Sequence, residues 1–296
     1  MTMLLRGKRA LVVGLMNKHS LAANVTQALL SHGAQVVVSS KSPLTESQRK
    51  ACGFHAPSSS MSATDESDTA IIAPSLHFRE CDVEDDTSIE ALISECGAIF
   101  GGQLDILVHS IAFAPRETFA GPGGILATSK SAWQQAMDVS TYSLIALTRT
   151  AYPLLSSGAD GSLARDRSIL ALSYAGANKV IPNYNVMGLA KAALEATSRQ
   201  LAHELGPEGI RVNCLSPGPM NTVSARGIPG ISRMRKYSEE HSPLRRNATG
   251  FEIGNTAAFL ASDMASAITG QIIYASRKQK KCFVINVMEC KTGSDE

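Results

Sequence analysis

The stretch from Ser173 to Lys191 contains two tyrosines, Tyr174 and Tyr184, followed by Lys191, in a chain with only 6 tyrosines among 296 residues. On a helix, seven residues return to within about 20° of the same face and rise roughly 10 Å. Tyr184 and Lys191 can therefore point into one cleft, where a phenol and an ammonium group would both act as hydrogen-bond donors. The structural alternative is a half-buried core tyrosine and a solvated lysine.

These side chains need elements to position them, and the sequence alternates apolar runs with helical patterns. Strands are predicted at 9–14, 34–40, a segment ending near 83, 104–110, 167–173, 210–216 and 270–274. Helices are predicted at 20–32, 85–100, 129–151, 184–206 and 249–262, with an irregular segment up to about 247. Such alternation indicates an α/β fold, a Rossmann-like doubly wound parallel sheet of about seven strands with helices on both faces. Tyr174 then ends the fifth strand.

The turn after the first strand could hold a phosphate. The dinucleotide pattern G-x-G-x-x-G is absent, and only Gly14 is left, with Ser20 placed to cap the next helix and to offer its hydroxyl to a phosphate. A lone glycine after a strand is also an ordinary turn. However, Asp82 and Val83 end the third strand and small residues in 109–115 end the fourth. Ligands of open parallel sheets bind at this carboxyl edge.

The chain resembles the short-chain dehydrogenase/reductase superfamily and, within it, the NADH-dependent enoyl-[acyl-carrier-protein] reductases of bacterial-type fatty acid synthesis. The resemblance covers about 7–273 and rests on the segments "GLMNKHSLA", "CDVEDD", "HSIAFAP", "LSYAGANKVIPNYNVMGLAKAALEA", "GPEGIRVNCLSPGPMNT" and "GNTAAFLASDMASAITGQ". Ketone reductases of the superfamily mostly carry Tyr-x3-Lys and a serine thirteen residues before the tyrosine. Here the spacing is Tyr-x6-Lys and that position is Ala171, which opposes simple carbonyl reduction.

The resemblance implies a role for each of the three residues. Lys191 would bind the nicotinamide ribose, and Tyr184 would donate a hydrogen bond to the thioester carbonyl of a trans-2-enoyl chain that receives hydride at C3. Tyr174 would orient the substrate or donate a proton. It also implies an acyl carrier protein as partner and a homo-oligomer, expected to be a tetramer.

Other positions carry over from the resemblance. The cofactor contacts it implies are Gly14, Ser20, Leu21, Asp82, Val83, Ile111, Lys191, Met220, Asn221, Thr222, Val223 and Ser224, and the substrate contact is Ala114. A substrate flap is expected at about 219–247, with Gly227 and Gly230 as hinges.

The choice of cofactor depends on the end of the second strand. The acid that usually reads the ribose 2′-hydroxyl is missing there, and the sequence has Ser39, Ser40 and Lys41. NADH is our first expectation because the family's NADH enzymes often lack this acid. Lys41 could instead meet the 2′-phosphate of NADPH, or could be a solvated loop charge.

Composition excludes several other classes. The net charge of +2, with 28 basic and 26 acidic residues, predicts no nucleic-acid partner. No apolar run is long enough to span a bilayer. The 6 cysteines form no metal-binding pattern, so we expect no metal and a reducing compartment. The N-terminus leaves no room for a leader, so we expect a cytoplasmic protein, or one of the plastid stroma if a transit peptide is missing from this chain.

We expect a single reductase domain over 1–274 and an atypical tail over 275–296, where the resemblance stops and where we expect disorder. The altered tail leaves room for a catalytically impaired nucleotide-binding homologue. A short-chain reductase of another carbonyl or enoyl substrate is the other alternative.

Overall fold

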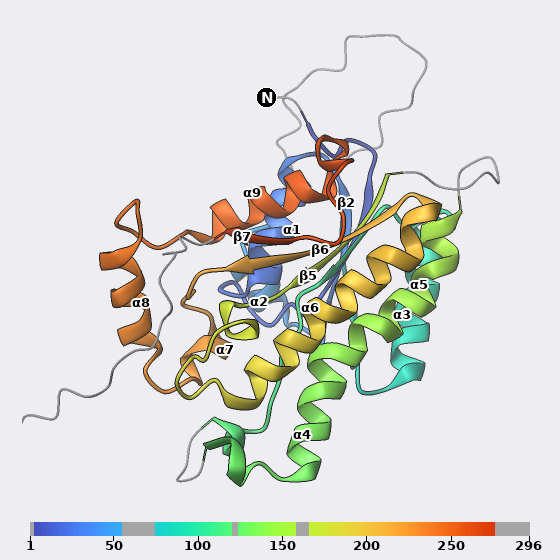
Figure 1. Ribbon diagram of the computed structural model, residues 1–296. Coiled ribbons are helices and arrows are strands. Elements are labelled where there is room, and N and C mark those ends of the chain that lie inside the picture. The colour runs from blue at the N-terminus through green and yellow to red at the C-terminus, as the bar shows by residue number, and fades with distance from the viewer. Residues whose placement is uncertain (1–2, 55–74, 120–123, 158–165, 276–296) are drawn as a thin grey trace, which may run out of the picture.

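The computed structural model describes residues 3–54, 75–119, 124–157 and 166–275 (Figure 1). The atypical tail predicted over 275–296 lies outside these ranges except for its first residue. Two polar stretches of the sequence, 55–74 and 158–165, lie outside them as well.

One sheet of seven parallel strands organises the described chain. The strands are β1 (Arg9–Val13), β2 (Gln35–Ser40), β3 (Leu76–Glu80), β4 (Ile106–His109), β5 (Arg167–Leu172), β6 (Ile210–Pro217) and β7 (Ile272–Ala275). Their order is β3-β2-β1-β4-β5-β6-β7, and each neighbouring pair is parallel. The order runs outward from β1 in both directions, so the predicted doubly wound Rossmann-like sheet is confirmed.

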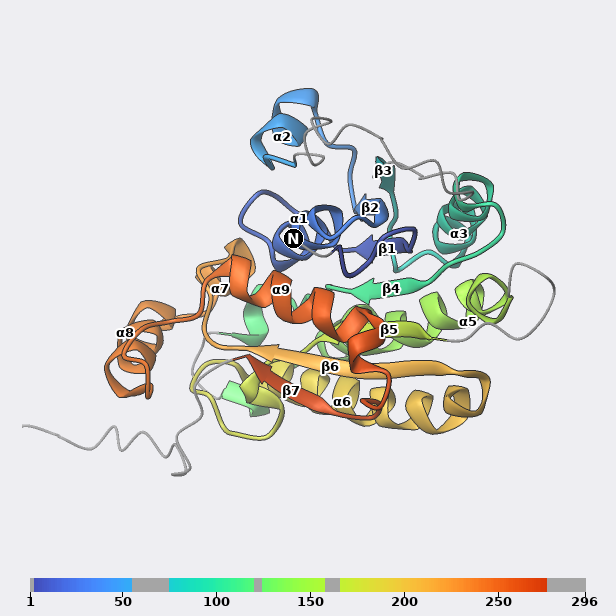
Figure 2. The same ribbon diagram turned by 90° about the horizontal axis from the view of Figure 1, so that it is seen from above.

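Helices cover both faces of this sheet because successive strand residues point to opposite sides. The α-helices are α1 (Leu21–Ser31), α2 (Glu46–Ala51), α3 (Asp86–Phe100), α4 (Lys130–Met137), α5 (Ser143–Ser156), α6 (Asn185–Leu205), α7 (Val223–Arg226), α8 (Ile231–His241) and α9 (Gly250–Ala261). One core packs α1 and α9 against the sheet, and a second packs α3, α5 and α6 against its other face. Figure 2 shows α8 standing away from both layers.

Two predictions about helices were incomplete. The helix predicted over 129–151 is interrupted by a π-helical turn, η3 (Asp138–Tyr142), which separates α4 from α5. The segment predicted as irregular contains α7 and α8. None of the residues of α8 is fully buried, and its mostly polar sequence presents only a short apolar face, with Ile231 and Met234. The short α2 was also missed, and it too has no buried residue.

No helix in the described part of the chain is long and apolar enough to cross a membrane. Within the same ranges, no group of histidine, cysteine, aspartate or glutamate side chains could hold a metal ion.

Candidate active site

The carboxyl ends of β1 and β4 meet at the turn predicted to receive phosphate. Gly14 has a φ of +109°, and a Cβ placed there would lie 2.3 Å from the carbonyl oxygen of Ser110. Its amide donates to the carbonyl of Ser39 at the end of β2. Only glycine fits this turn, because a side chain would meet the backbone of the neighbouring strand.

The turn leads into α1 at Ser20. The Ser20 side chain caps the helix by accepting from the amide of Ala23, as predicted, and Leu21 is the first helical residue. The Ser20 hydroxyl also donates to the carbonyl of Asn17 at 2.7 Å. The hydroxyl hydrogen is thus engaged within the turn, and the anion-binding capacity of this element comes from the backbone amides that begin α1.

Lys191 is buried under the carboxyl ends of β4 and β5. Its ammonium group donates to the carbonyl of Leu172 at 2.7 Å and to that of Ile111 at 3.2 Å. An ammonium group has three donors, so one is left for another acceptor. Burial lowers the pKa of Lys191 to about 8, while Cys214 and Glu195 act in the opposite direction. The group therefore titrates much closer to neutrality than an ordinary lysine.

Tyr174, two residues beyond the Leu172 carbonyl that Lys191 bonds, contacts Tyr184. Their ring centroids lie 5.0 Å apart in an edge-to-face arrangement. Burial raises the pKa of Tyr174 to about 12, and burial together with Tyr174 raises the pKa of Tyr184 further. Both phenols are consequently protonated hydrogen-bond donors throughout the neutral range. The structure brings the three predicted catalytic residues to one edge of the sheet.

Two glycines make room for the Tyr184 ring. A Cβ at Gly176 would lie 2.4 and 2.6 Å from two ring carbons of Tyr184, and a Cβ at Gly188 would lie 2.9 Å from the carbonyl of Gly176. The loop after β5 therefore passes directly over the tyrosine ring. Sequence analysis did not single out these glycines.

The predicted substrate contact and the predicted flap join Tyr184 in one apolar cluster. Its buried members include Ala114 from the loop after β4 and Ile228 from the segment between α7 and α8. Ile231 and Met234 of α8 pack against the same cluster. The segment predicted as a flap thus packs with the tyrosine in this cluster, although α8 itself stands clear of the sheet.

The π-helical turn supplies two contacts that sequence analysis missed. The Ser140 hydroxyl bonds both the amide and the carbonyl of Phe113, each at 2.9 Å, and so holds the loop that carries Ala114. The Thr141 hydroxyl donates to the carbonyl of Ala190, next to Lys191, at 2.8 Å. π-Helical turns occur frequently at functional sites.

A buried carboxyl group was missed as well. Glu195 lies four residues after Lys191 on α6 and accepts a hydrogen bond from the Ser173 hydroxyl. This helical spacing was a signal in the sequence, but an acid on a helix is usually solvated.

His109 is also buried, with its Nε2 2.7 Å from the Ser143 hydroxyl, and burial lowers the pKa of this imidazole to about 3. His109 is therefore neutral at neutral pH.

Lys41 forms an ion pair with a residue predicted to bind the same cofactor. Its ammonium lies 3.0 Å from the carboxylate of Asp82 and 2.7 Å from that of Glu84. Lys41 is therefore neither free nor an isolated loop charge. Val83, between the two acids, packs its side chain against the core that contains α3.

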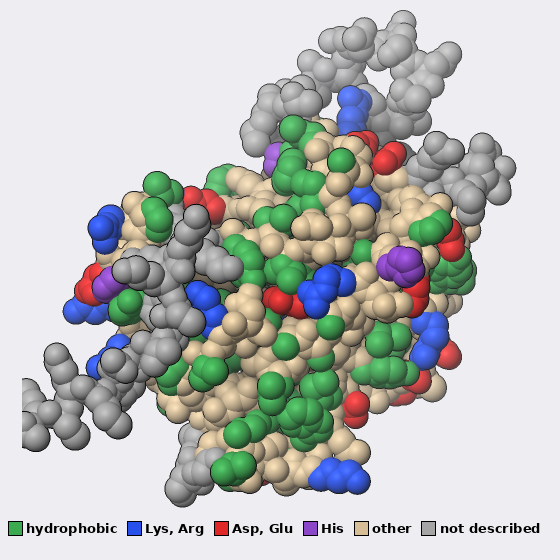
Figure 3. Space-filling view, viewed as in Figure 1, with side chains coloured by type: hydrophobic (Ala, Val, Ile, Leu, Met, Phe, Trp, Pro, Cys, Tyr) green, Lys and Arg blue, Asp and Glu red, His purple; other side chains and the backbone are tan. Residues whose placement is uncertain are grey.

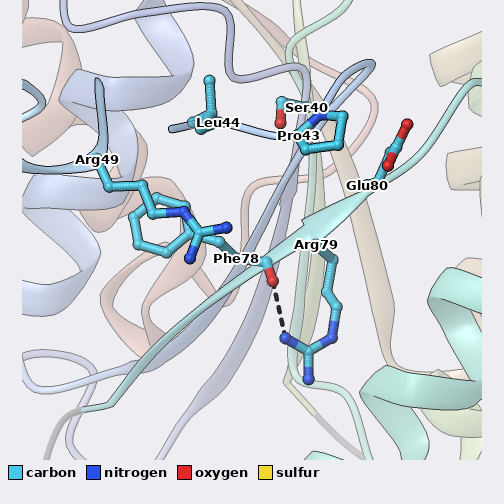
Figure 4. A pocket seen from close by; sticks show the side chains of 7 residues that line it. All are labelled: Ser40, Pro43, Leu44, Arg49, Phe78, Arg79 and Glu80. Carbon is cyan, nitrogen blue, oxygen red and sulfur yellow. Dashed lines mark hydrogen bonds between the residues drawn. The ribbon is translucent and has the colours of Figure 1, made fainter. Parts of the chain in front are cut away.

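A pocket of about 220 Å³ lies between β2, β3 and α2, and Ser40, the residue before Lys41, is part of its lining (Figure 4). Ser40 and Glu80 line it at the strand ends, and the Arg49 guanidinium lies 5.0 Å from the centroid of the Phe78 ring. Arg49 and Arg79 bring cationic groups to this side of the sheet.

The loop after β6 contains the remaining predicted cofactor contacts. Met220 packs partly buried against the core of α1 and α9. Asn221 is exposed and accepts from Arg226, while the Thr222 hydroxyl accepts from the amide of Ala225. Val223 and Ser224 form the first turn of α7 together with Ala225 and Arg226.

The doubly wound sheet, the tight turn at Gly14 and the Tyr-x6-Lys arrangement at the start of α6 define a nucleotide-dependent reductase of the short-chain type. A family model described as "Enoyl-(Acyl carrier protein) reductase" matches residues 14–277. The chain belongs to this family.

Individual relatives agree with the family match. The chain is 42% identical over 274 residues to the NADH enoyl-[acyl-carrier-protein] reductase of Synechocystis sp., covering 91% of this chain and 95% of that protein. The crystal structure of the NADH enzyme from Aquifex aeolicus is 39% identical, with a TM-score of 0.77, over 93% of this chain and 96% of that one. The Bacillus cereus enzyme, solved with NADP+ and an indole naphthyridinone, is 32% identical with a TM-score of 0.79, over 94% and 97% of the two chains.

Proposed function

We propose that this protein is an enoyl-[acyl-carrier-protein] reductase of fatty acid synthesis, which uses NADH to reduce the double bond of trans-2-enoyl thioesters. The observation that carries the proposal is the contact of Tyr174 with Tyr184 next to the end of β5, where the buried Lys191 donates to the carbonyl of Leu172. The membership of the chain in the reductase family supplies the reaction class.

Tyr184 is proposed as the donor to the thioester carbonyl. Its burial keeps the phenol protonated, so that its O–H can meet negative charge that develops on the oxygen. A donor held in a buried site stabilises that charge more than it stabilises the neutral substrate, because little reorganisation is needed. Tyr174, in edge contact with this ring, would orient it or supply a proton.

Lys191 is proposed to bind the ribose next to the nicotinamide. Two of its donors hold Leu172 and Ile111, which fixes the ammonium group and leaves the third donor for a ribose hydroxyl. The amides that begin α1 at Leu21 would receive the pyrophosphate, beside the glycine turn. When bound, the nicotinamide supplies the hydride that C3 of the substrate accepts.

The remaining contacts that the sequence predicts are part of the proposal. Asp82 and Val83 would line the pocket for the adenine ring, and Ile111 would contact the cofactor after β4. Ala114 would contact the acyl chain beside Tyr184. The loop from Met220 to Ser224 would approach the cofactor from β6.

NADH is proposed over NADPH because Lys41 is already paired. Asp82 and Glu84 place two carboxylates around the group that would have to meet a 2′-phosphate. Like charges repel, so these acids disfavour the extra phosphate and Lys41 alone does not create a site for it.

The partner would be acyl carrier protein, and the assembly a homotetramer. Figure 3 shows hydrophobic side chains gathered over the part of the surface formed by α4 and α5. Trp133 of α4, Tyr142 of the π-helical turn and Ile145 of α5 are exposed by 40%, 43% and 36%. Exposed apolar patches mark contact surfaces. The four cysteines among the described residues are all free thiols, in keeping with the cytoplasm or a plastid stroma.

The test is reduction of crotonyl thioesters of coenzyme A and of acyl carrier protein, followed by loss of the reduced cofactor's absorbance, with NADH and NADPH in parallel. Turnover of the enoyl thioester supports the proposal. Nucleotide binding without turnover would point to the impaired homologue, and reduction of a ketone instead would point to another short-chain reductase. Light scattering of the purified protein tests the tetramer.

A further inference from the structure

Two asparagines with positive φ angles flank Tyr184 in the sequence. Asn183 has a φ of +65° and Asn185 a φ of +36°, so both are in the left-handed region. Residues other than glycine rarely adopt this region, and it persists only when surrounding contacts impose it. Asparagine tolerates it better than most residues. The strain falls on the two neighbours of the proposed catalytic tyrosine.

Each asparagine side chain bonds a different segment of the chain. The Asn183 amide donates to the carbonyl of Pro229, between α7 and α8, at 3.1 Å. The Asn185 amide donates to the carbonyl of Thr118, in the loop after β4, at 2.9 Å. Both bonds join residues that are distant in sequence, so neither is a by-product of local helix geometry.

The two bonded segments are those that pack on Tyr184 itself. Pro229 follows Ile228, and Thr118 belongs to the same loop as Ala114; Ile228 and Ala114 are buried with Tyr184 in one cluster. Thr118 is also held in place, since it is 1% exposed and its hydroxyl donates to the carbonyl of Pro115. The Asn185 bond is therefore made to a fixed loop, whereas the Asn183 bond is made to the flap.

We infer that Asn183 and Asn185 are positioning residues that set Tyr184 between the flap and the loop after β4, and that Asn183 couples the position of the flap to that of the tyrosine. This inference rests on the proposed role of Tyr184. When the flap covers the cluster, the Pro229 carbonyl holds the residue before Tyr184 in its left-handed conformation. When the flap moves away, that conformation loses its support and the tyrosine loses its fixed position.

The variants Asn183→Gly and Asn183→Asp separate the contribution of the side-chain amide from that of the backbone conformation. Glycine adopts positive φ freely but has no donor, and aspartate tolerates positive φ but its carboxylate repels the Pro229 carbonyl. We expect both variants to lower kcat by about tenfold, as loss of one positioning hydrogen bond would, at unchanged NADH affinity and melting temperature. Asn178→Ala is the control: it lies in the same loop, but its amide donates to the Tyr274 hydroxyl.

A second measurement reports on the flap without activity. Arg233 and Lys236 are exposed on α8, so trypsin can cut the flap when it opens. We expect Asn183→Gly to speed this cleavage several-fold, as loss of a hydrogen bond to the flap would. Asn185→Gly should lower kcat while cleavage stays at the rate of the unmodified protein, because its partner is the loop after β4.

The outcomes are distinguishable from those of the proposed function. If the unmodified protein fails to reduce crotonyl thioesters, the proposed function fails, and trypsin cleavage still decides whether Asn183 holds the flap. If the unmodified protein is active while Asn183→Gly matches it in kcat and in cleavage rate, the coupling is wrong. Equal loss of activity in Asn178→Ala would also overturn it, since the loop as a whole would then be responsible.

Discussion

The hydroxyl of Ser173 donates to the Glu195 carboxylate at 2.6 Å. Glu195 lies one helical turn after Lys191, which donates to the carbonyl of the preceding residue, Leu172. Lys191 and Glu195 thus fasten α6 to two consecutive residues at the end of β5. Tyr174 is the next residue of the chain. The position of the first tyrosine is therefore set by two buried side chains of the helix that carries the second.

Glu195→Gln should make cofactor binding more sensitive to alkali. Glu195 opposes the lowering of the pKa of Lys191, which is about 8, so removing its charge lets that pKa fall further. The ammonium is charged below its pKa, and NADH affinity should decline as pH rises through it. Fluorescence titration of NADH across pH should show the decline at lower pH in the variant. The other groups facing Lys191, His109 and Cys214, are unchanged.

Glu204→Gln is the matched control for this experiment, because Glu204 is exposed further along α6 and bonds only Gln200 among the described residues. An identical pH profile in Glu195→Gln and Glu204→Gln would refute the electrostatic role of Glu195.

The titration of Lys191 also affects the stability of the fold. Lys191 is deprotonated in the folded state between pH about 8 and its ordinary 10.5, where the unfolded chain holds the proton. Its contribution to the free energy of unfolding should therefore rise with pH in that window.

Tyr184→Phe should lower turnover of crotonyl thioesters by roughly 10²–10³, the usual cost of one donor to a developing oxyanion. NADH affinity should persist because the phenol is proposed to contact the substrate and not the cofactor. Steady-state kinetics with a parallel NADH titration measures both. Tyr152→Phe is the control, since that hydroxyl bonds Glu208 away from the carboxyl edge. Undiminished turnover in Tyr184→Phe would show that another group donates the hydrogen bond to the thioester carbonyl.

Gly176→Ala should displace the Tyr184 ring. The added methyl would lie 2.4 Å from a ring carbon, and such overpacking costs about 1–3 kcal/mol of stability. We expect a lower melting temperature together with reduced turnover. Gly206→Ala adds the same methyl at the end of α6, where no other atom lies within 4 Å, and should change neither quantity. Equal melting temperature and turnover in the two variants would mean that the loop over the ring can shift to accommodate the methyl group.

Glu84→Gln should improve the use of NADPH. Lys41 lowers the pKa of Glu84, which shows that the carboxylate is charged and paired at neutral pH. Removing this charge leaves Lys41 with Asp82 alone and reduces repulsion of a 2′-phosphate. We expect the KM for NADPH to fall several-fold while that for NADH changes little, since the pair is exposed and screened. Glu46→Gln, a paired acid of α2, is the control. A fall in both KM values would show a general effect of charge.

The sequence predicted the strands because most are short apolar runs, and buried parallel strands are recognisable by composition. The edge strands β3 and β7 have no buried residue, and β3 is half polar. It also predicted the three residues that meet at the carboxyl edge, since a tyrosine and a lysine seven apart on a helix share a face. The fold and the family are thereby confirmed, while the roles of the site residues remain predictions.

The contacts that hold the site were beyond the sequence. Ser173 and Glu195 are paired only after a strand and a helix have packed, and Lys41 meets Asp82 and Glu84 only because β2 and β3 are neighbours. Helix α8 was missed because most of its residues are polar and its apolar face is short, with Ile231 and Met234. Long-range pairs of polar residues leave no periodic pattern in one sequence.

The π-helical turn at Asp138–Tyr142 has a consequence for the length of the chain at this point. Such a turn is in effect a one-residue insertion accommodated inside a helix, so loss of one residue there would restore an unbroken α-helix and leave the sheet untouched. The side chains beyond the deletion would rotate by about 100° relative to those before it. Ser140 and Thr141 could then not both face their present backbone partners. A chain with this helix straightened would keep the architecture and lose the present contacts of Ser140 and Thr141 with the two segments around Tyr184 and Lys191.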